Sequence, residues 1–198
     1  MPETYCEFDR KGRGDAVNVD LYGYDPLQDV AVVQARHAFR QYRNGYLSIR
    51  KTYFLCGFNE ITEAPFRHPI SASAIHAAIR RGADAAGVVR AAAKWMWQVD
   101  DRRLETGIRQ GDVLLVPERR RPIGVLEELG STTIVGGSHE VAAARIVRDE
   151  RGMVWADSPT IRHTKRQHDT VYGDRDGWHT VRVAREADAW NFAARLGD

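Results

Sequence analysis

Two cysteines, no long apolar run and almost no net charge set the first limits on this 198-residue sequence. Cys6 and Cys56 allow one bridge at most, and in a reducing compartment they are expected to be free thiols, so a disulfide-built scaffold is excluded. Nowhere do about 18 apolar residues run together, as a membrane-spanning helix requires. Lys plus Arg total 29 against 27 for Asp plus Glu, so the overall charge points to neither nucleic acid nor an anionic membrane.

The first residues, Met-Pro-Glu-Thr-Tyr-Cys, lack the basic and apolar regions of a signal peptide. We therefore expect a cytoplasmic protein with no membrane partner. Apolar residues make up 43% of the chain and charged residues 28%, which is typical of a globular protein with a sizeable core. Because no internal repeat or low-complexity linker is present, two halves that share a core are expected.

The apolar pattern changes near residue 108, from helical spacing to alternating strands separated by Gly, Pro and Asp. We therefore expect an α-rich N-terminal region over residues 1–108 and a β-rich, histidine-containing domain with a short C-terminal helix over residues 109–198. The predicted fold class is α+β, with the N-terminal helices packed on a small C-terminal β-barrel or two-layer β domain.

In the N-terminal half, the row Val32, Ala35, Phe39 and Tyr42 predicts a helix over 30–43 that ends at Asn44-Gly45. A strand is expected over 46–55, followed by a loop through 57–69. Further helices are expected from Ser71 or Ser73 to Arg81, from Asp84 to Trp97, and from Asp100 or Asp101 to Thr106. The first 29 residues are expected to be an irregular arm with one short strand over 16–22.

The C-terminal half contains short apolar runs that predict strands, with a hairpin turn at 148–152 and a closing helix over 187–196. The predicted strands lie at 111–117, 132–135, 140–147, 153–156 and 180–184.

Four of the seven histidines, His139, His163, His168 and His179, fall in the last 60 residues. His139 and His179 share the apolar faces of their predicted strands and begin those strands, so both are expected to point into one end of the barrel. His163 and His168 lie on the connection between them. Because imidazole is a common ligand of transition metals, the four histidines predict a metal site, with zinc the favoured ion.

A metal-activated water at this site would suit hydrolysis of a phosphoester or an amide. Glu140 is the candidate general base, and Arg185 or Arg162 the candidate that stabilises developing negative charge. The alternative is that these histidines are half-buried residues hydrogen-bonded to the backbone, and their spacing matches no established metal motif.

The β half also resembles a family of small bacterial and phage proteins of uncharacterised activity. The resemblance rests on Arg109 to Pro117, Gly136-Gly137-Ser138-His139, His163 to His168, and Gly177 to Glu186. The family pattern is R-Q-G-D-V-L-L, T-G-H-x-H, H-E-E-H, and G-x-Y-x-V with a final R-E. It covers about 80 residues and implies that this order of histidines belongs to one compact β domain. Here Gly137 stands for one family histidine and His179 for its tyrosine.

A basic row provides a second, non-enzymatic hypothesis. No acid lies between Asp29 and Glu60, whereas five bases do, with tyrosines among them. On the predicted helix, Arg36, Arg40 and Arg43 form one face, which predicts an adaptor that binds nucleic acid or a protein partner. Arg50 and Lys51 extend the candidate nucleic-acid surface. The same row is also compatible with an ordinary solvated helix face.

Overall fold

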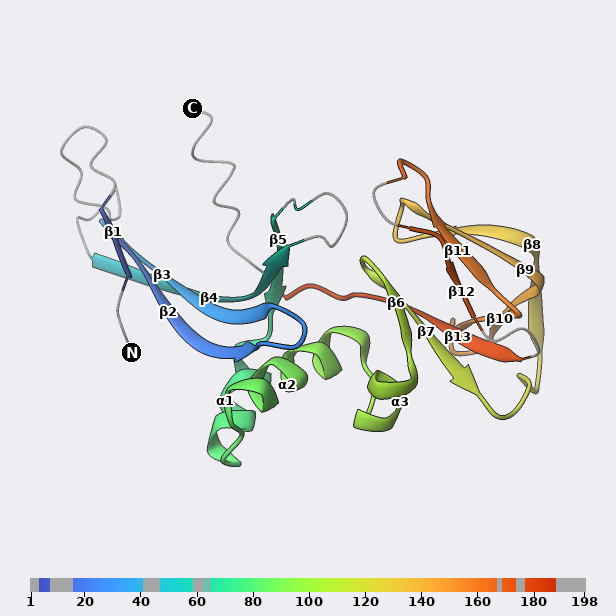
Figure 1. Cartoon of the computed structure of the whole chain (residues 1–198), viewed down its shortest axis with the longest axis horizontal. Coiled ribbons are helices and arrows are strands. Elements are labelled where there is room, and N and C mark those ends of the chain that lie inside the picture. Colours follow the sequence, from blue (N-terminus) through green and yellow to red (C-terminus); the bar gives the residue numbers. More distant parts are fainter. Residues whose placement is uncertain are drawn as a thin grey trace. The chain divides into compact units, whose positions relative to one another are not determined.

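A computed structural model describes residues 4–7, 16–40, 47–58, 63, 65–166, 169–173 and 177–187. The chain forms two compact units, visible in Figure 1. Unit 1 comprises residues 1–58, 65–95 and 186–198, and unit 2 comprises residues 59–64 and 96–185. Within the described ranges there are thirteen strands and three helices. The predicted fold class is therefore wrong, because the N-terminal region builds a sheet of its own where helices packed on a barrel were expected.

Unit 1 contains a five-stranded antiparallel sheet in which each strand pairs with the next along the chain, in the order β1-β2-β3-β4-β5. Its strands are β1 (Thr4–Glu7), β2 (Ala16–Asp25), β3 (Val30–Arg40), β4 (Leu47–Phe58) and β5 (Pro65–Ile70). The helices α1 (Ala72–Arg80) and α2 (Ala85–Trp97) follow, and Figure 1 shows them running along one face of this sheet.

The segment predicted as a helix over 30–43 is the central strand β3. Val30, Val32 and Gln34 alternate along it and are all buried, whereas the helical row used for the prediction required every third or fourth residue. A short apolar segment satisfies both periods, and β-branched valines together with pairing to β2 and β4 on either side favour the strand. The segment 65–70, predicted as a loop, is likewise the strand β5.

The three predicted helices after residue 70 are confirmed, and two of them begin with an aspartate cap. Asp84 Oδ1 accepts a hydrogen bond from the backbone amide of Gly87 at 2.8 Å, at the start of α2. Asp100 Oδ1 accepts one from the amide of Arg103 at 2.8 Å, at the start of α3 (Asp101–Thr106). These bonds satisfy amides that have no partner inside a helix, which is why the caps could be read from the sequence.

The helix α2 packs closely on the sheet of unit 1 at Gly23. A Cβ added there would lie 2.7 Å from the Ala85 carbonyl oxygen and 2.9 Å from Val88 Cβ. The strand β2 also shifts register between Leu21 and Gly23, so Tyr22 has no partner on β3. Glycine at this position therefore allows the helix to approach the backbone, and the bulge redirects the tyrosine beside it.

Unit 2 contains an eight-stranded antiparallel sheet, in the order β12-β11-β9-β10-β13-β7-β6, with β8 paired to β9. Its strands are β6 (Ile108–Gln110), β7 (Val113–Glu118), β8 (Leu126–Val135), β9 (His139–Asp149), β10 (Val154–Asp157), β11 (Thr160–His163), β12 (Val171–Tyr172) and β13 (Trp178–Val183). The strands predicted in this half and the turn at 148–152 are present. The sequence did not predict β6, β11 and β12, which are short.

The sheet of unit 2 is a nearly closed barrel, because its end strands β6 and β12 lie next to each other. Gln110 on β6 contributes to this closure, since its side-chain amide donates to the backbone carbonyls of Ile161 and Asp169. The interior is mainly apolar and includes Leu115, Val141 and Ile146, none of which is exposed. Part of the fold expectation, a barrel-like β domain, is therefore confirmed.

Two further expectations concern the ends of the chain and membranes. Most of the predicted closing helix, 187–196, lies outside the described residues. In the described part of the chain, no helix combines the length and apolarity needed to cross a membrane.

Candidate functional site

Two of the predicted histidines are neighbours inside unit 2. His139 on β9 lies directly opposite His163 on β11, and their ring centroids are 4.9 Å apart with the rings nearly perpendicular. Both side chains are buried, at 2% and 4% exposure. His139 and Val141 share the face that packs in the barrel core, so this part of the expected geometry is present.

Backbone contacts restrict what these imidazoles can do. The amide of Lys165 donates to His163 Nδ1 at 3.1 Å, so a neutral His163 carries its proton on Nε2. A metal could bind His163 through Nδ1 only if that hydrogen bond were lost. His179 has the opposite arrangement, because its Nδ1 faces the Gly177 carbonyl at 3.0 Å and must donate to it. This leaves the lone pair of His179 on Nε2.

His179 is not beside the other two histidines. It lies opposite Ala156, which in turn lies opposite Ile146, seven positions along β9 from His139. The strands β11 and β10 pair with successive parts of β9, β11 near His139 and β10 near Ile146. His179, which lies beyond β10, is therefore at another level of the barrel than His139. His168 lies outside the described residues. Among the described residues, no group of three or more His, Cys, Asp or Glu could hold a metal ion.

The metal site therefore stays a prediction. Elemental analysis of protein dialysed without chelator tests it directly: a stoichiometric transition metal would support the histidine site, and substoichiometric metal with no gain on reconstitution would remove it.

The predicted catalytic partners lie apart from the histidine pair. Arg162 Nη2 donates to Glu140 Oε1 at 2.8 Å, in an ion pair between cross-strand neighbours. Because successive side chains of a strand point to opposite faces, Glu140 and Arg162 point away from the face of His139 and His163. Arg185 follows β13 and is exposed, and its backbone amide donates to the Met96 carbonyl.

The basic row of unit 1 lies on strands, so the predicted helix face is wrong. Arg36 on β3 is directly opposite Lys51 on β4, on one face of the sheet, whereas Arg50 lies opposite His37 on the other face. The side chain of Arg40 and the whole of Arg43 lie outside what the structure describes. The row is therefore divided between two faces, because strand geometry alternates and helix geometry does not.

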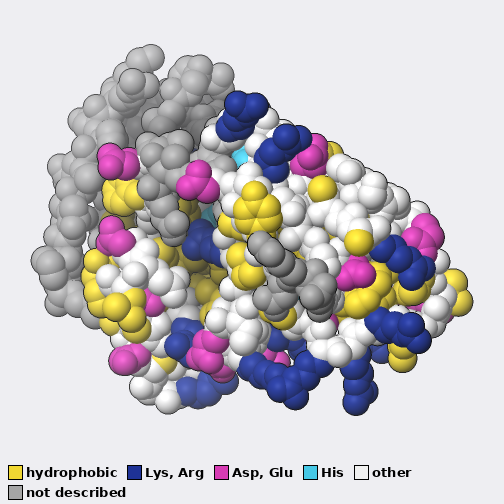
Figure 2. Space-filling model, turned by 45° about the vertical axis from the view of Figure 1, so that its right-hand side comes forward, with side chains coloured by type: hydrophobic (Ala, Val, Ile, Leu, Met, Phe, Trp, Pro, Cys, Tyr) yellow, Lys and Arg dark blue, Asp and Glu magenta, His cyan; other side chains and the backbone are white. Residues whose placement is uncertain are grey.

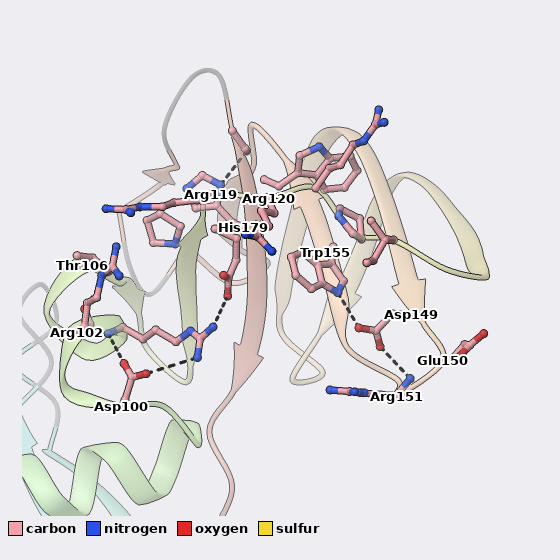
Figure 3. A pocket seen from close by; sticks show the side chains of 18 residues that line it. Asp100, Arg102, Thr106, Arg119, Arg120, Asp149, Glu150, Arg151, Trp155 and His179 are labelled. Atoms are coloured by element: carbon pink, nitrogen blue, oxygen red, sulfur yellow. Dashed lines mark hydrogen bonds and ion pairs between the residues drawn. The ribbon is translucent and has the colours of Figure 1, made fainter.

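Unit 2 contains an open groove that the sequence analysis did not identify. It encloses about 920 Å³ and lies between α3, the β7–β8 loop, the β9–β10 turn and the start of β13, as Figure 3 shows. The side chains that line it are mainly charged or aromatic. They are Asp100, Arg102, Arg103, Thr106, Pro117, Glu118, Arg119, Arg120, Arg121, Pro122, Ile123, Asp149, Glu150, Arg151, Trp155, Gly177, Trp178 and His179.

Six arginines and four carboxylates line this groove. Among the described residues, Arg103 is the one of the six that forms ion pairs with acids, while the charge of Arg151 acts on Asp149 without an ion pair. Arg103 forms ion pairs with Asp100 at 3.5 Å and with Glu118 at 3.4 Å. The other five are exposed and have no ion pair with any residue that the structure describes. We call these five the groove arginines: Arg102, Arg119, Arg120, Arg121 and Arg151.

The acid beside the β9–β10 turn is also committed to internal contacts. Asp149 accepts hydrogen bonds from the amides of Arg151 and Met153 and from the indole of Trp155, at 2.9 to 3.0 Å. Burial opposes ionisation of Asp149, but these hydrogen bonds together hold its pKa below the usual value. The charged form of Asp149 is therefore favoured. Its contacts with Arg151 and Trp155, drawn as dashed lines in Figure 3, fix the turn and orient the indole.

Two half-buried tryptophans lie on the groove side of the sheet. Trp155 on β10 and Trp178 on β13 are diagonal neighbours, since Trp155 pairs with Thr180. Both point to the face opposite Ala156 and Val181, which pack in the core. Trp178 also lies opposite Glu118, the residue before the run Arg119-Arg120-Arg121. Figure 2 shows hydrophobic side chains close to basic ones on the surface of the molecule.

One sequence signal could have identified this groove. The run Arg119-Arg120-Arg121-Pro122 is the densest group of positive charge in the chain, and it directly follows a strong strand pattern. The near-zero total charge hides it. The contributions of Arg102 and Arg151 could not be predicted, because they come from separate elements that only the barrel brings together.

Comparisons of this chain with protein-family models, with curated proteins and with solved structures found no match.

Proposed function

We propose that the protein binds nucleic acid, with the groove of unit 2 holding the phosphate backbone. The observation that carries the proposal is the set of five groove arginines, which are exposed around one concavity and have no ion pair with the described residues. Exposed like charges repel one another, so an arrangement of this kind is most favourable when an anion occupies it.

The chemistry of arginine fits phosphate in particular. The guanidinium presents donors in a planar fork that matches phosphate oxygens, and it remains charged at every physiological pH. A small anion would meet one or two of these groups, whereas a phosphodiester chain can meet all five as it follows the groove. The protein class supported best is therefore a non-enzymatic binding protein, which retains the class of the second hypothesis and moves it to another surface.

Salt dependence of affinity is the measurement that tests the proposal. Each phosphate neutralised on a single strand contributes a slope of about −0.7 to log Kobs against log salt, so five contacts predict a slope of about −3.5. Fluorescence anisotropy with a labelled single strand of mixed sequence gives this slope. Changing Arg119, Arg120 and Arg121 together to Gln should reduce it to about −1.4.

The matched control changes Arg36 and Lys51 to Gln, which removes the adjacent basic pair of unit 1 and should leave the slope unchanged. A wild type that ignores nucleic acid at low salt would overturn the proposal. So would loss of binding in the unit 1 control with retention in the arginine variant. Vesicles of anionic phospholipid form a third arm, and binding to them without binding to oligonucleotides would show that the groove recognises a membrane surface.

A further inference from the structure

The groove also contains aromatic side chains that a phosphate site does not need. We propose that Trp155 and Trp178 stack on unpaired bases, so that the ligand class of the groove is single-stranded nucleic acid. This inference rests on the proposed phosphate binding and goes beyond it, because arginines alone would accept a duplex equally well.

The position of the two rings supports the inference. Both lie on the same face of adjacent strands and line the same groove as the groove arginines. Trp178 is cross-strand partner to Glu118, which immediately precedes Arg119. An aromatic face next to a row of guanidinium groups is the arrangement by which proteins bind single strands, with bases on the rings and phosphates on the cations.

The ring of Trp155 is also held before any ligand binds. Its indole nitrogen donates to Asp149 Oδ2 at 3.0 Å, and Asp149 is itself held by two backbone amides of the turn. A ring fixed in this way loses little conformational freedom when a base stacks on it. Neither tryptophan is fully buried, in contrast to Trp97, which is 3% exposed and packs beneath the Arg109 guanidinium. The indoles of the groove therefore keep surface that a base can cover.

A duplex does not satisfy this arrangement. Its bases are already stacked on one another, so their flat faces are not accessible to the indole rings of the groove. Reading the bases by stacking requires an unpaired strand, and it tolerates any sequence because every base has a flat face.

The test compares a single strand with the same strand carrying base-free sugars at most positions, so that the two probes have the same phosphates. The duplex, which has the phosphates of two strands, is the third probe. Each base that stacks is expected to tighten binding by about 5- to 150-fold. The wild type should therefore bind the ordinary single strand at least about fivefold more tightly than the base-free strand. DNA and RNA versions of the single strand identify which backbone binds more tightly.

The variants Trp155→Ala and Trp178→Ala should remove this preference and leave the affinity for the base-free strand unchanged. Tyr172→Ala is the matched control, because Tyr172 is an exposed aromatic residue of unit 2 outside the groove, and it should change neither affinity. Trp178→Phe keeps an aromatic face and should retain most of the preference. It also shows whether a loss in Trp178→Ala reflects misfolding.

Two results separate this inference from the proposed function. If ordinary and base-free strands bind equally and the arginine variant weakens both, phosphate binding stands and stacking is overturned. If no strand binds, both fail. Trp95, Trp97 and Trp190 also fluoresce, so the signal of Trp178 is taken as the difference between Trp155→Phe and the double variant Trp155→Phe/Trp178→Phe. Quenching of this difference by the ordinary strand and not by the base-free one would confirm stacking without relying on an alanine variant.

Discussion

Units 1 and 2 both carry polar side chains in and around a β-sheet, but these side chains differ in whether they bond to one another. In unit 1 the Gln34 side-chain amide donates to the hydroxyls of Tyr22 and Tyr53, and Tyr53 shares a hydrogen bond of 2.7 Å with His76 on α1. In unit 2 the five groove arginines are exposed and lack ion pairs among the described residues.

This difference separates structural polar groups from those that can serve a ligand. Tyr53 is 2% exposed and meets Tyr22 and His76 edge to face, so its network ties the helix to the sheet. A buried network whose members satisfy one another stabilises one conformation and offers little to a partner. Exposed cations that form no ion pair with the described residues contribute little to the stability of the fold, which is why the function we propose lies in unit 2.

The largest expected effect is a loss of stability in the variant Leu115→Ala, which changes the apolar interior of unit 2. Leu115 has no exposed surface, and its strand β7 leads into the β7–β8 loop, which carries Arg119, Arg120 and Arg121. Loss of the side chain and the cavity left behind should lower the free energy of unfolding by about 2–5 kcal/mol. Urea denaturation followed by tryptophan fluorescence measures this. The control Ile123→Ala, at an 85% exposed position, should change it by less than about 0.5 kcal/mol. Equal effects would refute the barrel core.

A smaller loss is expected from Tyr53→Phe, which tests the network of unit 1. The change removes a buried hydroxyl and leaves Gln34 and His76 without that partner, so a cost of about 1–3 kcal/mol is expected. Tyr24→Phe is the control, since the Tyr24 hydroxyl bonds to Asp29 at an exposed site, and it should cost less than about 0.5 kcal/mol. A Tyr53→Phe variant as stable as the wild type would mean that the network is not structural.

The same tyrosine predicts a dependence on alkaline pH. Burial, together with the neighbouring Tyr22, raises the pKa of Tyr53 to about 12, from about 10 in the unfolded chain. The folded state therefore favours the neutral hydroxyl, so this stabilisation is complete below about pH 10 and is lost as pH rises towards 12. Denaturation at a series of pH values should show the decline in the wild type, and Tyr53→Phe should lack that component.

The smallest loss of stability is expected from Asp149→Asn in unit 2. Hydrogen bonds lower the pKa of Asp149 despite its partial burial, so its stabilisation is present above about pH 4 and is lost as pH falls through the lowered folded value. Because Asp149 is only partly buried and asparagine keeps one acceptor oxygen, the variant should lower the free energy of unfolding by no more than about 1 kcal/mol. The emission of Trp155, taken as the difference between spectra with Trp155 and with Trp155→Phe because the chain has five tryptophans, should shift as the indole loses its charged acceptor. An unchanged emission spectrum would contradict the proposed orientation of Trp155.

Local chemistry explains what the sequence predicted well. The helices α2 and α3 were predicted because Asp84 and Asp100 are caps, and a cap acts within a few residues of itself. The helix α1 was predicted from a cap at Ser71 or Ser73, and it follows Ser71 without a side-chain cap hydrogen bond. The turn after Asp149 was predicted for the same reason, since its bonds to Arg151 and Met153 are local.

Long-range pairing explains what the sequence missed. The strand β3 looks helical over 30–43 until β2 and β4 are known to flank it. His139 and His163 are neighbours because His163, expected on a connecting loop, lies on the strand β11 that pairs with β9. The level of His179 depends on a register that passes through two strand pairs, β9–β10 and β10–β13. The groove likewise needs α3 and the β9–β10 turn beside the arginine loop. None of these relations is local in the sequence.

Photo-cross-linking of a bound single strand tests most directly the claim that ligand binding belongs to unit 2. A strand carrying photoreactive bases is bound at low salt, irradiated and digested, and the linked peptides are identified by mass spectrometry. We predict adducts on the peptides that contain Trp155, Trp178 and residues 117–123, and their loss in the triple arginine variant. Adducts confined to residues 30–58, which carry Arg36, Arg50 and Lys51, would contradict the account and place the binding surface in unit 1.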